Sequence, residues 1–235
     1  MKTTKSWMPV DEMATQVSLP EGYRFELLAR PEIPTLVRFI EKWFPDISVG
    51  VASRYVRNDF YADNVTLEGE AQKDILVVLI KRGKDLAGLF SCERDRDALA
   101  LYAGLAVIAP AHRGAHLSRT CIKLVEAIGR RMGMGLVYGM ATLKIPQIQE
   151  AFERLDWQLI GITPGYDREL VSPGVVKRVY EAVYAKVLVR SGGLLHPELR
   201  NMTERTKRFF RMLFPRAEKH PRVVAGATLR HGTRS

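Results

Sequence analysis

Short apolar runs alternate along this chain with segments whose apolar residues recur at helical spacing. Within residues 33–44 the apolar positions fall three or four residues apart, at Leu36, Phe39, Ile40 and Trp43. Runs such as residues 75–80, ILVVLI, are instead short and continuous, as strands are. Strands interleaved with helices are typical of a sheet that helices cover on both faces. The chain is therefore predicted to adopt an α/β fold.

The predicted elements follow one another over residues 23–189. The expected strands cover residues 23–29, 75–80, 86–92, 98–108, 136–143 and 157–162, with a hairpin turn at residues 82–85. The expected helices cover residues 33–44, 53–65, 117–133 and 146–157. The segment 175–189 stays ambiguous, because its apolar spacing fits a helix whereas its many Val and Tyr residues favour a strand.

The composition fits one domain with terminal appendages. A chain of 235 residues that is 46% hydrophobic can bury a substantial core. We expect an N-terminal extension over residues 1–22, the domain over 23–189 and a tail over 190–235. No run of about 18 apolar residues is present, and the first residues lack the apolar stretch of a signal peptide. Two cysteines are too few for a disulfide framework, so a cytoplasmic protein is expected.

Most of the positive charge lies in the tail. Of the net charge of +10, residues 190–235 contribute +8, from eleven Lys and Arg residues against three acids. Helical spacing of apolar residues predicts an amphipathic helix over about residues 198–214, and the composition beyond it predicts disorder. We expect this helix to fold back onto the core. Binding of nucleic acid or an anionic membrane by the tail is the less favoured alternative.

The most informative stretch is residues 104–127, GLAVIAPAHRGAHLSRTCIKLVEA, in which an apolar strand meets a basic corner that opens directly into a helix. The first N–H groups of a helix lack intrahelical acceptors and carry partial positive charge, so a phosphate can bind there. Arg113 adds a full charge, Gly114 lets the backbone approach a ligand, and Ser118 offers a hydroxyl. A phosphate site is one interpretation, and an ordinary strand–turn–helix connection is the other.

The sequence VIAPAHRGAHLS, residues 107–118, resembles the acyl-CoA-binding signature of the GNAT acyltransferase superfamily. In that family a strand ending in Val-x-Pro precedes Arg/Gln-x-x-Gly-x-Gly/Ala and a helix, and the element order is similar over residues 23–189. The resemblance implies a mixed, splayed central sheet flanked by helices, with acyl-CoA, such as acetyl-CoA, in the split. It also implies that residues 175–189 form a strand.

The resemblance also implies which residues hold the acyl-CoA. The pyrophosphate is expected on the corner and the helix start, at Arg113, Gly114, Ala115, His116, Leu117 and Ser118. A backbone N–H near Ala106, Val107 and Ile108 is expected to hold the oxyanion of the reaction. His116 and Ser118 replace residues that are usually small in the family, so His116 is expected either to point away or to donate to a phosphate.

The catalytic positions depart from the family pattern. Phe152 stands where the family has the tyrosine that protonates the departing CoA thiolate, so it can line the cofactor site but cannot donate a proton. Tyr102 occupies the central-strand position that often carries a catalytic Glu, and is expected to relay a proton or line the pocket. A packed aromatic ring whose hydroxyl meets water is the favoured alternative. Strand alternation places it on one face with Gly104 and Ala106. We find no convincing base in the sequence.

Other motifs give weaker indications. His112 and His116 have no carboxylate at zincin-like spacing, so no metal site is expected. Residues 163–170, TPGYDREL, are expected to form a loop that borders the acceptor pocket in the resembling fold, or an ordinary surface turn.

We therefore expect an acyl-CoA-dependent N-acyltransferase, with acetyl favoured as the acyl group and a small amine as the acceptor. Direct transfer from bound acyl-CoA to the amine is what the family resemblance implies. A non-catalytic CoA-binding module is the alternative that Phe152 suggests, and a protein that works through its basic tail is another. A homodimer stays open.

Overall fold

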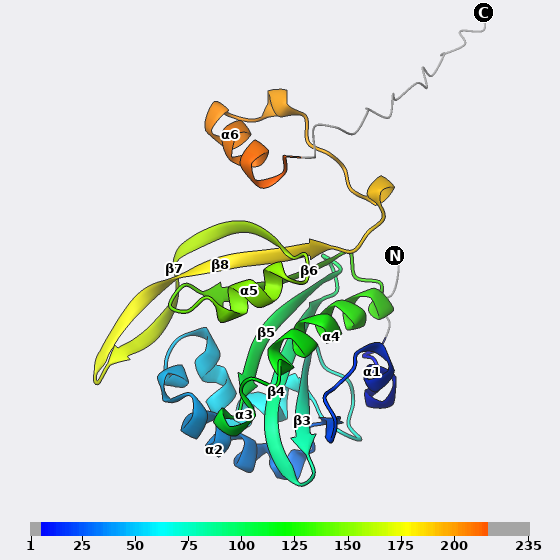
Figure 1. Ribbon diagram of the computed structural model, residues 1–235, viewed down its shortest axis with the longest axis vertical. Coiled ribbons are helices and arrows are strands. Elements are labelled where there is room, and N and C mark those ends of the chain that lie inside the picture. The colour runs from blue at the N-terminus through cyan, green and yellow to red at the C-terminus, as the bar shows by residue number, and fades with distance from the viewer. Residues whose placement is uncertain (1–5, 216–235) are drawn as a thin grey trace, which may run out of the picture. The chain divides into compact units, whose positions relative to one another are not determined.

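The computed structural model describes residues 6–215, which form two units (Figure 1). The first unit ends at Gly193 and the second begins at Leu194.

The first unit is built on an eight-stranded mixed sheet whose order is β1-β3-β4-β5-β6-β8-β7, with β2 paired to β3. Its strands are β1 (Tyr23–Leu27), β2 (Val65–Thr66), β3 (Ile75–Arg82), β4 (Asp85–Asp95), β5 (Ala100–Ile108), β6 (Leu136–Thr142), β7 (Gln158–Ser172) and β8 (Val175–Val187). The pairs β2–β3 and β5–β6 are parallel, and the other neighbours are antiparallel.

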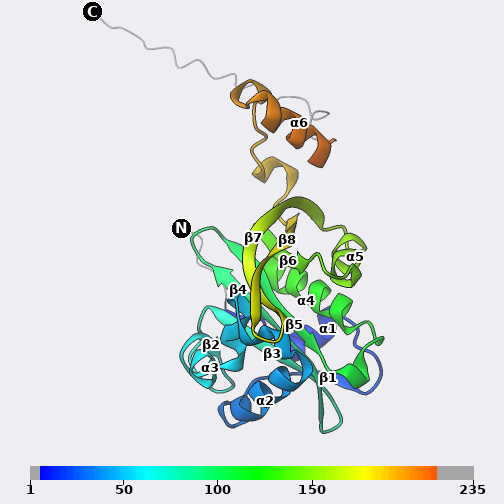
Figure 2. The same ribbon diagram turned by 90° about the vertical axis from the view of Figure 1, so that its left-hand side faces the viewer.

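Helices cover both faces of this sheet (Figures 1 and 2). They are α1 (Val10–Gln16), α2 (Ile33–Trp43), α3 (Asn58–Asn64), α4 (Leu117–Met132) and α5 (Gln147–Glu153). One core cluster joins the sheet to α1, α4 and α5, and we call this side the α4 face. A second cluster joins it to α2, α3 and a 3₁₀ turn at Val51–Val56, on the side that we call the α2 face.

The residues before β1 pack into the core of the first unit. Trp7 and Met13 are buried in the cluster of the α4 face, and the Trp7 indole donates a hydrogen bond of 2.8 Å to the carbonyl of Lys73. The sequence had predicted no helix in this segment, because α1 spans only seven residues and its periodicity is short.

The ambiguous segment is a strand, as the family resemblance implies. β8 pairs with β6 and β7 on its two sides, and alternate residues such as Ala182 and Tyr184 are buried on the α4 face. Its Val and Tyr content therefore outweighs the helical spacing.

Two expected elements differ from the structure. Residues 163–170 are not a loop, because β7 continues through them, and a register shift between Thr163 and Asp167 accommodates Pro164 and Gly165. The helix expected over residues 53–65 is divided into a 3₁₀ turn and α3, since Arg57 is extended between them.

The second unit contains a 3₁₀ turn at Leu199–Asn201 and helix α6 (Glu204–Leu213). The single helix expected over residues 198–214 is thus interrupted at Met202, which is extended, and α6 begins anew with Thr203, whose side chain accepts the Thr206 N–H. Packing of this helix on the core remains a prediction. The disorder expected at the end of the tail concerns residues 216–235, which lie outside the described residues. Within residues 6–215, no helix has both the length and the apolar character needed to cross a bilayer.

Candidate functional site

The central sheet opens between β5 and β6. These parallel strands are paired only from Ala100 and Leu136 to Ala103 and Gly139, although β5 continues to Ile108 and β6 to Thr142. Their carboxyl ends are therefore unpaired with one another. In α/β sheets, ligands bind where strands separate in this way.

A β-bulge lies at the start of this opening. Gly104 and Leu105 of β5 stand opposite the single residue Ser91 of β4, and the Leu105 N–H donates to the Ser91 hydroxyl at 2.9 Å. The extra residue reverses the side-chain alternation of β5. Tyr102 and Gly104 lie on the α2 face, whereas Ala106, paired with Phe90, lies on the α4 face. The prediction that Ala106 shares a face with Tyr102 is wrong for this reason.

The corner after β5 has the backbone that a helix-start anion site requires. Gly114 has φ of +93° and His116 has φ of +57°, a left-handed conformation that is unusual for a side chain other than glycine. α4 follows with no side-chain cap, Leu117 is buried as its anchor, and Ser118 lies in its first turn. The first N–H groups of α4 thus have no capping side chain among the described residues.

Basic side chains gather beside this uncapped helix start. A groove of about 270 Å³ is lined by His116, Arg119, Thr120, Lys123, Arg154 and Leu155. The Arg119 guanidinium lies 2.7 Å from Nδ1 of His116, and because a guanidinium can only donate, Nδ1 is the acceptor in this contact. The sequence analysis missed Arg119, Lys123 and Arg154, although the spacing of 116, 119 and 123 is that of one helix face.

Arg113 and His112 make contacts on the other side of the corner. The Arg113 guanidinium lies 5.3 Å from the centroid of the Phe44 ring, and its Nε–H reaches the Ile108 carbonyl at 3.5 Å. His112 contacts the Tyr23 hydroxyl through Nδ1 at 2.9 Å. His112 therefore fastens the corner to β1, and Arg113 is the cation nearer to α2.

Phe152 lies behind β6, in the core of the α4 face. It is 3% exposed, and its ring stacks on Tyr184 with 5.2 Å between centroids. A Cβ added at Gly139 would lie 2.9 Å from Cζ of Phe152, so the ring occupies the space that this glycine leaves.

On the α2 face, tyrosines and charged groups surround the opening. The rings of Tyr102 and Tyr138 are 5.1 Å apart, and Glu93, which pairs with Tyr102 across the sheet, accepts from Arg54 at 2.9 Å. Burial raises the pKa of Tyr102, and the nearby groups Tyr166 and Glu181 raise it further. This hydroxyl therefore stays protonated at neutral pH.

Glu181 of β8 is a functional candidate that the sequence analysis missed. Burial raises its pKa to about 7, and the carboxylates of Asp167 and Glu169 contribute to the rise. Acids with such a pKa are concentrated at functional sites. The sequence does not reveal Glu181 as a candidate, because the face of the sheet on which it lies depends on two facts. The segment must be known to be a strand, and its register must be known.

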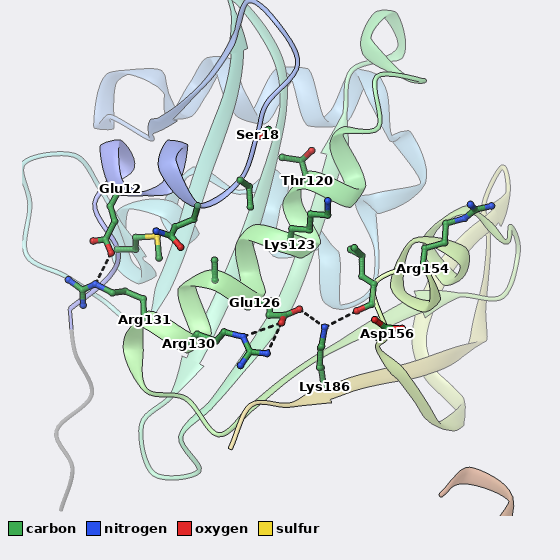
Figure 3. A pocket seen from close by; sticks show the side chains of 15 residues that line it. Glu12, Ser18, Thr120, Lys123, Glu126, Arg130, Arg131, Arg154, Asp156 and Lys186 are labelled. Atoms are coloured by element: carbon green, nitrogen blue, oxygen red, sulfur yellow. Dashed lines mark hydrogen bonds and ion pairs between the residues drawn. The ribbon is translucent and has the colours of Figure 1, made fainter. Parts of the chain in front are cut away.

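A larger groove of about 850 Å³ lies on the outer side of α4, between α1, α5 and the end of β8 (Figure 3). Glu126 accepts from Arg130 of the same helix and from Lys186 of β8, each at 2.8 Å, and the bond to Lys186 joins α4 to β8. Lys123 and Arg154 line both grooves, so the basic surface beside the helix start continues along α4. In residues 6–215 there is no cluster of three or more His, Cys, Asp or Glu side chains suited to a metal ion.

Solved structures share this fold at low sequence identity. The protein yncA of Salmonella typhimurium, a candidate acetyltransferase solved with its cofactor acetyl-CoA, is 12% identical with a TM-score of 0.54, over 72% of this chain and 95% of its own. A mutant of the spermidine N-acetyltransferase SpeG from Vibrio cholerae is 14% identical with a TM-score of 0.55, over 72% and 95% of the two chains.

A candidate acetyltransferase of the GNAT family from Desulfovibrio desulfuricans is 13% identical with a TM-score of 0.54, over 71% of this chain and 99% of its own. No protein-family model and no curated protein sequence matches the chain. The similarity thus lies in the fold, where the mixed sheet, its opening and the flanking helices agree with what the sequence resemblance implied. The chain has the fold of the GNAT-family acetyltransferases.

Proposed function

We propose that the protein transfers an acyl group, with acetyl favoured, directly from bound acyl-CoA to an amine. One observation carries this proposal: parallel strands separate beside an uncapped helix start around which basic side chains gather. The acetyl-CoA of yncA and the amine substrate in the name of SpeG support it as properties of proteins with the same fold.

The residues at the corner fit the anionic part of CoA. The free N–H groups at the start of α4 suit a pyrophosphate, and Gly114 exposes the backbone there, since nothing lies within 4 Å of a Cβ placed on it. His116, Arg119 and Lys123 supply side-chain donors on one helix face. Arg113 can add a further donor, because its Nη groups extend beyond its contact with Ile108.

The acyl end of the co-substrate would lie in the opening between β5 and β6. Backbone N–H groups near Ala106, Val107 and Ile108 are suited to stabilise the oxyanion that forms when an amine attacks the thioester carbonyl. Tyr102 lies on the opposite face at the same opening, so the acceptor can approach from the α2 face.

Binding and turnover together test the proposal. Acetyl-CoA should raise the melting temperature of the protein, because a ligand that binds only the folded state stabilises it by mass action. Thiol should then be released from acetyl-CoA when a suitable amine is added. If millimolar acetyl-CoA leaves melting unchanged, the proposal is wrong.

A CoA-binding module without catalysis is the second candidate. It is favoured by Phe152, whose buried ring stands where the family has a proton-donating tyrosine. Tight binding of acetyl-CoA without thiol release over a broad panel of amines would identify this alternative.

A further inference from the structure

Strand register places Glu181 at the same opening as the packed, tilted rings of Tyr102 and Tyr138. Glu181 pairs with Thr142 across β6 and β8, two residues along β6 from Met140 and four from Tyr138. Because alternate residues of a strand share a face, Glu181 and Tyr138 lie on the α2 face, and Tyr102 is beside Tyr138 across β5 and β6.

A second strand adds two carboxylates to this face. Asp167 pairs with Val179 and Glu169 pairs with Lys177, so both acids of β7 lie on the α2 face near Glu181. The register shift between Thr163 and Asp167 places Asp167 opposite Val179, so that it lies two residues along β8 from Glu181. The exposed ring of Tyr166 lies within the shifted segment.

The carboxylates around the opening differ in their partners. Asp167 accepts the backbone N–H groups of Val51 and Arg168, at 2.7 and 2.6 Å. Glu169 forms an ion pair with Lys144.

Glu93 forms an ion pair with Arg54 at 2.9 Å. The carboxylate of Glu181 has no hydrogen bond or ion pair with any of the residues 6–215. Among the four acids Asp167, Glu169, Glu93 and Glu181, only Glu181 thus has a carboxylate without a partner in residues 6–215. Its charge can therefore interact with a bound ligand.

Electrostatics explain what such a group attracts. Three carboxylates gathered on a partly buried surface repel one another, and a cation among them lowers that repulsion. The faces of tyrosine rings attract cations as well, most strongly where water is excluded. Arg54 and Lys144 are already paired with Glu93 and Glu169, so they do not neutralise Glu181.

We propose that Glu181 is the general base of the transfer, and that the acceptor is an aliphatic amine with a second positive charge, held against Tyr102, Tyr138 and Tyr166. This inference rests on the proposed acyltransferase function. It supplies the base that the sequence did not reveal, and it names the chemical class of the acceptor. A diamine fits because one nitrogen can react while the other remains a cation beside Asp167 and Glu169.

The reaction balances with Glu181 in this role. An ammonium R–NH₃⁺ and acetyl-S-CoA give R–NH–CO–CH₃, HS-CoA and one H⁺. The Glu181 carboxylate takes one proton from the ammonium, and the freed lone pair on nitrogen forms the N–C bond. The C–S bond then breaks with its electron pair on sulfur, which takes the second proton from nitrogen. Glu181 returns its own proton to solvent, ready for the next turnover.

The first experiment measures binding without acetyl-CoA. Calorimetry should rank 1,4-diaminobutane above n-butylamine, and n-butylamine above 4-aminobutanoate, whose carboxylate would be repelled. Glu181→Gln should weaken 1,4-diaminobutane binding by about ten-fold or more. Glu41→Gln is the matched control, because Glu41 is an exposed glutamate of α2. Equal affinity for all three amines would overturn the acceptor class.

The second experiment measures stability and turnover together. The pKa of Glu181 is about 7, above its ordinary value of 4.5, so ionisation destabilises the folded state as pH rises from about 4.5 to 7. Glu181→Gln should therefore melt at a higher temperature than the wild type at pH 8, and at the same temperature at pH 4. The variant should also lose about 100-fold in kcat for 1,4-diaminobutane and lose the acidic limb of the pH–rate profile.

The outcomes separate this inference from the proposed function. Failure of acetyl-CoA to bind contradicts the acyltransferase proposal as a whole. If acetyl-CoA binds and diamine is acetylated, an unchanged kcat and pH profile in Glu181→Gln contradicts Glu181 as the base alone. Glu181→Asp should recover part of the activity, which loss through misfolding would not do. If acetyl-CoA binds without turnover, the binding measurement decides. An affinity for 1,4-diaminobutane that Glu181→Gln leaves unchanged would then contradict the role of Glu181.

Discussion

Tyr102 of β5 packs against Tyr138 of β6, with 5.1 Å between the ring centroids and 35° between the ring planes. The two residues form the last pair but one before the strands separate. The aromatic pair therefore closes the narrow end of the opening on the α2 face, and any acceptor that enters from that side meets these rings.

The ring of Tyr102 is expected to matter more than its hydroxyl. Tyr102→Phe should keep kcat within about three-fold of the wild type, because the wall of the site is preserved, whereas loss of a proton relay would slow transfer by ten-fold or more. Tyr102→Ala should raise KM for the amine about ten-fold, since it removes the ring that packs against Tyr138. Steady-state kinetics of both variants with saturating acetyl-CoA decide between the two roles.

Recognition of CoA should depend on the helix face that bears Arg119 and Lys123. Replacing either residue by Ala should weaken acetyl-CoA binding by about 1–2 kcal/mol, the usual worth of a charge-assisted contact. Arg113→Ala should have a smaller effect, because that guanidinium already lies over Phe44. Titration calorimetry measures these affinities, and Arg38→Ala on the exposed side of α2 serves as the control. An equal loss in all four variants would point to nonspecific charge attraction.

The contact between Gly139 and Phe152 predicts a packing defect. Gly139→Ala places a Cβ 2.9 Å from Cζ of Phe152 and 3.2 Å from Cβ of Ala103, so it should destabilise the fold by about 1–3 kcal/mol. Phe152→Leu in the same chain should recover part of this loss, and denaturant unfolding of the single and double variants gives the coupling between the two sites. Strict additivity of the two changes would contradict a direct contact.

Phe152→Tyr tests whether the family's proton donor can be restored. The new hydroxyl would extend from Cζ toward Gly139 in a region that is 3% exposed, so we expect loss of stability and no gain in kcat. Melting temperature and thiol release measure the two effects. A gain in kcat would show that this position faces the leaving sulfur.

The ion pairs in the groove along α4 should make a stability contribution that depends on pH. Burial alone would raise the pKa of Glu126, but its bonds to Lys186 and Arg130 outweigh burial and lower it. A lowered pKa stabilises the fold above about pH 4.5, and this stabilisation is lost as pH falls through the folded-state pKa. Glu126→Gln should cost about 1 kcal/mol at pH 7 and progressively less toward pH 3. Glu150→Gln, which loses only an exposed helical pair, is the control variant.

Much of the fold could be predicted from local patterns. α4 matches its expected limits because its periodicity is strong and Gly133 ends it with φ of +77°. The length of β7 was underestimated because Pro164 and Gly165 are typical of a turn. Pairing with β8 nevertheless continues the strand beyond these two residues. Local sequence cannot reveal this, since the pairing depends on a second strand.

The site was harder to predict than the fold. The corner at Arg113 and Gly114 was identified from its own sequence, because a helix start is a local feature. Glu181 was missed because its neighbours depend on how β8 pairs with β6 on one side and with β7 on the other. Ala106 was assigned to the wrong face, since the sequence does not reveal which residues of β5 form a bulge.

Because of the bulge at Gly104 and Leu105, the two halves of β5 direct comparable side chains to opposite faces of the sheet. Upstream of it, Tyr102 presents its side chain to the side where an amine can approach, and downstream of it Ala106 presents its side chain to the side of α4. Under the proposed function, changes that adapt the protein to a new acceptor would therefore accumulate in the first half of β5 and in β8, while the second half of β5 and the start of α4 would keep binding an unchanged acyl donor. In that proposal, a single inserted residue in this strand makes the choice of acceptor and the choice of donor separately adjustable.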